Sequence, residues 1–139
     1  DQTSTAGQVP GTDLGGVTVE VRDASGVGRL ATLIWVSPAQ INFVTPDQTG
    51  TGLATVFVNR TGQRVASGIV EVTRVAPGVF LPEGIPRPSG DTLTLNATGI
   101  RGRSSLSAIR VTIGVTPAPV MRADPSTVVP GVDQLRRIA

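Results

Sequence analysis

The side chains that most enzymes use for catalysis are almost all missing from this sequence. It contains no His, Cys, Tyr or Lys, and all twelve basic residues are Arg. A general base that works near neutral pH is usually His, and a Ser or Thr nucleophile needs His or Lys to activate it. Zinc, copper and haem sites would lack their usual nitrogen and sulfur ligands. The composition therefore predicts a protein that is not an enzyme.

Only the ten carboxylates remain as candidates for catalysis. They are scattered singly along the chain, so a glycosidase that works with a carboxylate pair would need folding to bring two of them together. The Asp residues never form the closely spaced acidic loop that binds calcium. We therefore expect no catalytic residue, no cofactor-binding residue and no metal ligand in this chain.

The Ser-Pro-Ala-Gln-Ile-Asn segment invites a binding-site interpretation. The amides of Gln40 and Asn42 would contact sugar hydroxyls, and Trp35 just before them would be a stacking platform. However, Gln40 and Asn42 have the same parity in an extended segment, so both project to one side. There they would bond backbone groups at a sheet corner, with Ile41, Phe43 and Trp35 in the core. We favour this structural interpretation.

Two other groups of polar residues have functional interpretations. Arg101 and Arg103, with Arg110 following, form the closest basic cluster, but flanking Gly and Ser indicate an exposed loop and the chain has few aromatic residues. Nucleic-acid surfaces usually combine Arg with exposed aromatic side chains, so we expect solvated Arg and no nucleic-acid partner. Asn59 and Asn96 each begin an N-glycosylation pattern, which arises easily in a Thr-rich chain, and their modification stays open.

The elements that must carry these residues are β-strands. Seventeen Gly and eleven Pro indicate many turns and no long helix. Val17, Val19 and Val21 alternate with polar residues, as in a strand with one buried face. Turns about every ten residues favour an all-β, immunoglobulin-like β-sandwich. Strands are predicted at residues 17–21, 30–36, 40–44, 53–59, 65–75, 93–97, 109–115 and 128–138, with a hairpin turn at 59–63, a bulge at Gly68 and a short turn at 103–108.

The sequence divides into an extended tail at residues 1–13, a first β-unit at 14–81, a Pro- and Gly-rich connector at 82–90 and a second β-unit at 91–139. Val17-Thr18-Val19 and Val111-Thr112-Ile113 lie 94 positions apart, and so do Gln40-Ile41 and Gln134-Leu135. Two diverged copies of one β-unit, packed together, would explain this echo, as would chance similarity among Val- and Thr-rich strands. The second unit has no counterpart of the first unit's hairpin at residues 53–75, so it is expected to be incomplete.

Several motifs, in order, resemble an uncharacterised domain family found at the C-termini of large secreted proteins, notably in acidobacterial-type bacteria. The resemblance covers roughly Leu14 to Leu135. It implies an extracellular or cell-surface protein with immunoglobulin-like units of the IPT/TIG type, and no known activity. The matching motifs are Val36–Pro46 (VSPAQINFVTP), Ala76–Phe80 (APGVF), Thr98–Leu106 (TGIRGRSSL), Val111–Gly114 (VTIG), Pro117–Val120 (PAPV) and Pro130–Leu135 (PGVDQL).

The chain departs from this family pattern at its C-terminal end. Family members continue beyond the second Gln motif through a polar loop and a further hairpin, whereas this sequence stops at Ala139. Arg136-Arg137-Ile138-Ala139 also replaces the expected alternation of Asn and Val. The second unit is therefore either truncated or an incomplete sandwich with an open edge.

An open sheet edge recruits another strand, and proteins use this for strand addition between subunits. We therefore predict a secreted structural protein, a subunit of an extracellular filament or surface assembly, joined head to tail by β-strand sharing with the tail at residues 1–13 as donor. A tail that packs on its own domain is equally compatible with the sequence. The alternative function is an accessory glycan- or cell-wall-binding module of a larger secreted protein. No apolar run approaches the roughly 18 residues that span a membrane, so no membrane insertion is expected.

Overall fold

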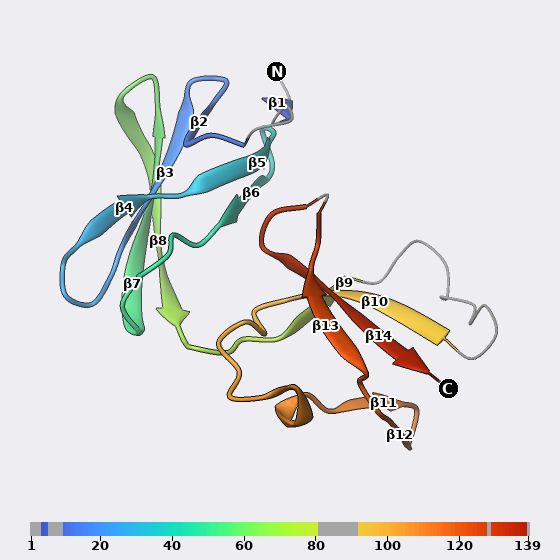
Figure 1. Ribbon diagram of the computed structural model, residues 1–139. Helices are drawn as coiled ribbons and strands as arrows, with labels where there is room; N and C mark the ends of the chain where they lie inside the picture. Colours follow the sequence, from blue (N-terminus) through green and yellow to red (C-terminus); the bar gives the residue numbers. More distant parts are fainter. Residues whose placement is uncertain (1–3, 6–9, 81–91, 128, 139) are drawn as a thin grey trace. The chain divides into compact units, whose positions relative to one another are not determined.

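A computed structural model describes residues 4–5, 10–80, 92–127 and 129–138. The regular structure is almost entirely β, in several antiparallel sheets, which confirms the predicted all-β, sandwich-like fold. The chain divides into two compact units, Asp1–Thr73 and Arg74–Ala139. Figure 1 shows the strands of the first unit in blue to green and those of the second in yellow-green to red.

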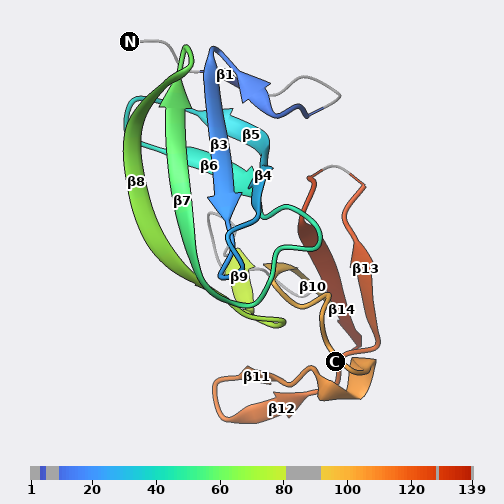
Figure 2. The same ribbon diagram turned by 90° about the vertical axis from the view of Figure 1, so that its left-hand side faces the viewer.

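The first unit consists of two sheets. The larger sheet has the order β2-β3-β7-β8, with β4 also paired to β3, and the smaller sheet has the order β1-β5-β6. Figure 2 shows β7 between β3 and β8 in the larger sheet. The strands are β1 (Ser4–Thr5), β2 (Asp13–Leu14), β3 (Val17–Arg22), β4 (Gly28–Leu30), β5 (Thr32–Val36), β6 (Ile41–Val44), β7 (Gly52–Arg60) and β8 (Gln63–Val72).

The core of the first unit forms where the alternating face of β3 meets the smaller sheet. Val17, Val19 and Val21 are buried, as the period-two pattern predicted, and they belong to one cluster with Leu33 and Val36 of β5. Full burial of each such aliphatic side chain contributes about 1.5–3 kcal/mol to folding. The β3 face therefore holds the two sheets together.

The predicted strand at residues 30–36 is divided at Ala31. β4 pairs with β3 in the larger sheet, whereas β5 pairs with β6 in the smaller one. Between them Ala31 is buried, and its N–H donates to the carbonyl of Val19. The chain crosses from one sheet to the other at this residue, which explains why one continuous apolar run contains two strands.

Trp35 lies outside the core, so the prediction that it is a core residue was wrong. The β5–β6 register shifts between Leu33 and Trp35, which makes Ile34 an extra residue on β5. Leu33 and Val36 therefore both join the core although they are three positions apart. Trp35 is turned to the opposite face of the sheet, where it is half-buried.

The sequence predicted a bulge at Gly68, but the bulge in the β7–β8 hairpin lies at Val65. Gly68 pairs in register with Val56, and a Cβ atom added there would meet nothing within 4 Å. The register instead shifts where Ala66 pairs with Val58 and Arg64 pairs with Asn59, leaving Val65 as the extra residue. Gly68 therefore does not mark a bulge, and no neighbouring atom of the described residues lies close enough to require a glycine there.

The second unit contains a four-stranded sheet of order β13-β14-β10-β9 and a separate hairpin, β11-β12. Its buried cluster consists of Ala97, Ile100 and Leu135, against which Leu95 and Val111 pack. Residues 103–108, predicted as a short turn, include a single turn of 3-10 helix. The elements are β9 (Gly78–Phe80), β10 (Thr92–Thr98), η1 (Leu106–Ala108), β11 (Val111–Ile113), β12 (Thr116–Ala118), β13 (Arg122–Pro125) and β14 (Val132–Ile138).

Three predictions for this half of the chain need correction. Residues 78–80, assigned to the first unit, pair with β10 of the second, and the connector predicted at 82–90 lies outside the described residues. Residues 109–115 do not form one strand, because Gly114 has a positive φ and makes a two-residue hairpin turn with Val115, which is 98% exposed. The sequence echo is not matched in topology, since β3 is central in its sheet whereas β11 pairs only with β12.

Candidate functional site

The most exposed long element of the described chain is β8. Residues 63–71 are all exposed, and only Val72 at its end is half-buried. β8 pairs with β7 on one side and, among the described residues, with no strand on the other. Its ten residues exceed the average strand length of about 5–6. β8 therefore presents a long row of unpaired backbone donors and acceptors.

The inward face of β8 is also uncovered. Ala66, Gly68 and Val70 pair with Val58, Val56 and Ala54, which face the core of the first unit. All three residues of β8 are nevertheless exposed. The smaller sheet therefore covers β3 and β7 but does not extend over β8.

Apolar side chains project from both faces of this edge. Ile69 on the outward face is 73% exposed, and Val70 on the inward face is 42% exposed. Val65, at the bulge, lines a groove of about 590 Å³ that is bordered by core residues such as Val36 and Ile41. Val65 therefore connects the exposed strand to a groove whose lining is part apolar and part polar.

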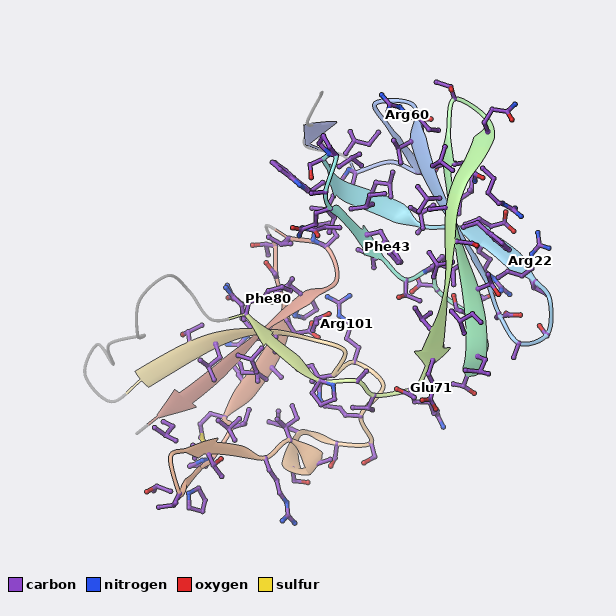
Figure 3. All side chains as sticks on the ribbon, turned by 180° about the vertical axis from the view of Figure 1, so that it is seen from behind. Arg22, Phe43, Arg60, Glu71, Phe80 and Arg101 are labelled. Atoms are coloured by element: carbon purple, nitrogen blue, oxygen red, sulfur yellow. The ribbon has the colours of Figure 1, made fainter. Side chains whose placement is uncertain are left out.

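Opposite charges mark the two ends of β8. Arg64 lies over the ring of Phe57 and 3.9 Å from a carboxylate oxygen of Glu20, which places it on the outward face. Glu71 pairs with Leu53 on the same face and has no ion pair within the described residues. Figure 3 shows Glu71 at the C-terminal end of β8. Because of the bulge at Val65, both charges share one face although their numbers differ in parity.

The prediction that the Gln40 and Asn42 amides bond to backbone groups was wrong. These two amides bond to each other. Gln40 Nε2 donates to Asn42 Oδ1 at 2.7 Å, and both side chains are exposed. Ile41 and Phe43 pack against the core, as predicted. The tight turn before β6 is fixed by Ser37, whose Oγ accepts the Gln40 N–H. Gln40 borders the groove described above, whereas Asn42 does not.

Asp23 is a buried carboxylate that ties together two loops of the first unit. Its Oδ1 accepts hydrogen bonds from Ser25 and from the N–H of Val27, and its Oδ2 accepts from Arg29 and from the N–H of Gly50. The Ser25 hydroxyl and the Gly50 N–H hold the pKa of Asp23 well below its ordinary value. An acid that stays ionised in this way is a poor proton donor, so Asp23 is a structural group.

The predicted basic cluster is not a set of free cations. Arg101 pairs with the buried carboxylate of Asp133, and Arg103 donates to the carbonyls of Ile100 and Ala123. Arg110 is exposed and does not border their pocket. Asp133 was overlooked in the sequence, although it shares the parity of the core residue Leu135 and so signals an inward-facing charge.

The remaining polar candidates lie on strands. Asn59 on β7 is half-buried, with its amide 3.4 Å from the hydroxyl of Thr18, and Asn96 on β10 is exposed. Glu20, Asp23, Asp124 and Asp133 each pair with Arg. Within the described ranges no group of His, Cys, Asp or Glu side chains has the arrangement of a metal site. No helix in those ranges is long and apolar enough to cross a membrane.

Comparisons of the chain with family models, curated proteins and solved structures found no significant match. The resemblance to the secreted bacterial domain family therefore stays a prediction. Among the surfaces described above, the free edge of β8 is the most extensive.

Proposed function

We propose that the protein is a non-enzymatic structural subunit of an extracellular assembly, in which copies join by antiparallel pairing of their β8 strands. The observation that carries this proposal is a ten-residue edge strand exposed on both faces. Soluble proteins usually protect such edges with short strands, Pro, charged side chains, bulges or a covering segment. In β8 the bulge and the charged residues lie toward its ends, at Val65, Arg64 and Glu71, so within the described part of the chain the stretch from Ala66 to Val70 has none of these protections. An edge of this kind is suited to strand addition.

The charges at the ends of β8 favour a second copy as the partner. In an antiparallel pair, Arg64 of each copy comes to the end of the strand where Glu71 of the other copy lies. Opposite charges across neighbouring strands contribute about 0.2–1 kcal/mol each, and a two-fold contact contains the pair twice. Val65, Ile69 and Val70 supply apolar contact between the charged ends. The edge is thus complementary to itself.

A filament also needs a second contact, and β1 supplies a candidate. Ser4 and Thr5 pair with Val36 and Trp35 of the same chain, so this part of the tail completes the smaller sheet in cis. Exchange of β1 between neighbouring β8 dimers would keep the same two pairs and link the dimers into a fibre. In this proposal, strand sharing by the N-terminal tail is the second step of assembly, after β8 pairing.

The molar mass of the purified chain, measured by light scattering over a wide concentration range, tests the β8 contact. Ile69→Lys places a charge on the edge and should leave a monomer where the native chain is dimeric or larger. Val115→Lys is the matched control, because it adds the same charge at an exposed apolar position outside β8. A native chain that remains monomeric throughout, or an I69K variant that assembles as well as V115K, would rule out the β8 contact.

A further inference from the structure

A pocket of about 380 Å³ lies within the second unit, separate from the β8 edge. Its volume falls within the range of roughly 300–1,000 Å³ that is typical of small-molecule sites. Its lining is part polar and part apolar, and the apolar residues are Leu106, Ala123 and Pro125. The polar lining comes from Arg101, Arg103, Ser105 and Asp133.

Asp133 is the unusual member of this lining. The residue is 2% exposed, and its Oδ1 accepts a hydrogen bond of 2.9 Å from Arg101 Nε. Its Oδ2 is buried and has no hydrogen-bond partner within the described residues. A buried carboxylate oxygen without a donor has lost its hydration without compensation, so such groups are rare unless something else supplies the donor. One residue of the pocket lining therefore carries a buried acceptor that has no partner among the described residues.

The two arginines beside it have N–H groups that their hydrogen bonds within the described residues do not use. Arg101 also donates from Nη2 to the carbonyl of Val132, and Arg103 donates from its two terminal nitrogens to the carbonyls of Ile100 and Ala123. Each guanidinium has five N–H donors, so each keeps donors that these bonds do not use. Figure 3 shows Arg101 beside the β13–β14 hairpin. Its side chain is 53% exposed, which leaves it room to rotate and open a path to Asp133.

The geometry points to a neutral, polyhydroxylated ligand, and we propose that this pocket binds a sugar ring. A hydroxyl group donates and accepts at once, so one hydroxyl can donate to Asp133 Oδ2 while a neighbouring hydroxyl accepts from Arg101 or Arg103. An anion could meet the two guanidinium groups but offers no donor, so it would leave Asp133 Oδ2 without a partner. A cation would be repelled by both guanidinium groups. The apolar side chains of the lining suit the C–H groups of the ring.

Nuclear magnetic resonance of the full chain, titrated separately with glucose, mannose and galactose, tests this site. We expect at least one hexose to give saturable shifts of the backbone amides of Arg101, Arg103 and Asp133. Asp133→Asn should weaken that binding about tenfold, because the amide nitrogen would replace an acceptor. Asp124→Asn is the matched control, since Asp124 lies on β13 with its own Arg122 partner and does not border the pocket.

Ser105→Phe is a second variant in case the loss of the ion pair with Arg101 unfolds the D133N protein. Ser105 is exposed and extended, so a phenyl ring at this position fills the pocket without entering the core. Sodium acetate and methylammonium chloride are the charged probes. The proposal is overturned by the absence of shifts with all three hexoses, by unchanged hexose affinity in S105F or in folded D133N, or by stronger binding of either charged probe. Its outcome is independent of the β8 contact, because every residue involved lies in the second unit.

Discussion

The guanidinium carbon of Arg64 lies 3.6 Å from the centroid of the Phe57 ring, on the outward face of the β7–β8 hairpin. The contact exists because the bulge at Val65 turns Arg64 to the Phe57 side of the sheet. Arg22 lies over the same ring at 5.3 Å, so Phe57 is placed between two cations. Contact with the Phe57 ring therefore holds the Arg64 side chain, at the N-terminal end of β8, on the outward face of the sheet.

A double-mutant cycle on Phe57 and Arg64 should detect this contact in the isolated fold. Phe57→Leu removes the ring, and Arg64→Met removes the charge while keeping an extended apolar side chain. We expect a coupling free energy of about 0.5–1 kcal/mol from urea unfolding of the two single variants and the double variant. Additive effects would show that the two side chains do not interact in solution.

Reversing the charge of Glu71 should weaken self-association. Glu71→Arg would bring like charges together at both ends of an antiparallel β8 pair, and we expect the dimer dissociation constant to rise about tenfold. Arg64→Glu combined with Glu71→Arg should recover part of the loss, measured by sedimentation equilibrium. Asp47→Arg, at an exposed acid outside β8, is the control for net charge. Equal effects of E71R and D47R would contradict antiparallel pairing.

Removal of residues 1–9 should separate the two proposed contacts. The shortened chain loses β1 and its pairs with Val36 and Trp35 but keeps β8. We expect dimers by light scattering and no fibres by electron microscopy, whereas the longer chain forms fibres. Fibres from the shortened chain would show that β1 exchange is not the second contact.

Asp23→Asn should lower stability at neutral pH and flatten its dependence on acid. The folded state holds the pKa of Asp23 below its ordinary value of 3.8, so the native chain has this stabilisation above that pH and loses it as the pH falls below. The midpoint of urea unfolding should therefore differ most between the native chain and D23N near pH 7, and converge in acid. Asp47→Asn serves as the control, and a constant difference at all pH values would refute the assignment.

Gly99→Ala should destabilise the second unit strongly. Gly99 has a φ of 69°, and an added Cβ would clash with the carbonyl oxygen of Ala76, whose N–H donates to Gly99 O. Gly114→Ala is a matched control, because Gly114 has a φ of 60° and open space around it. We expect G114A to lose about 1–2 kcal/mol from backbone strain alone, and G99A to lose clearly more by thermal unfolding. Similar losses of stability in G99A and G114A would show that the Cβ atom at position 99 does not clash with Ala76.

The parts of the fold that the sequence predicted are those governed by local alternation. Val17, Val19 and Val21 show the buried face of β3 directly, and the turn residues at 59–63 mark the β7–β8 hairpin. The misassigned Trp35 has a different cause, since one extra residue at Ile34 reverses every side chain after it, and no local pattern marks that residue.

The candidate sites depended on partners distant in sequence and were harder to predict. β8 was recognised as a strand, but its position at the sheet edge follows only from the order of all the strands around it. Arg101 and Asp133 are 32 positions apart, and their ion pair exists because β14 returns beside the loop after β10. Neither relationship is encoded in a short motif.

The bulge at Val65 also limits slippage. In the register that sets Arg64 opposite Glu71, two copies of β8 form a regular ladder from Ala66 to Val70, and the extra residue Val65 of each copy separates this ladder from the charged pair at its end. A shift by one residue would turn every side chain of the incoming strand to the wrong face, and a larger shift would run into the irregular step. The same irregularity makes β8 a poor template for the endless, in-register stacking of amyloid, so association at this edge is confined to a short, defined overlap.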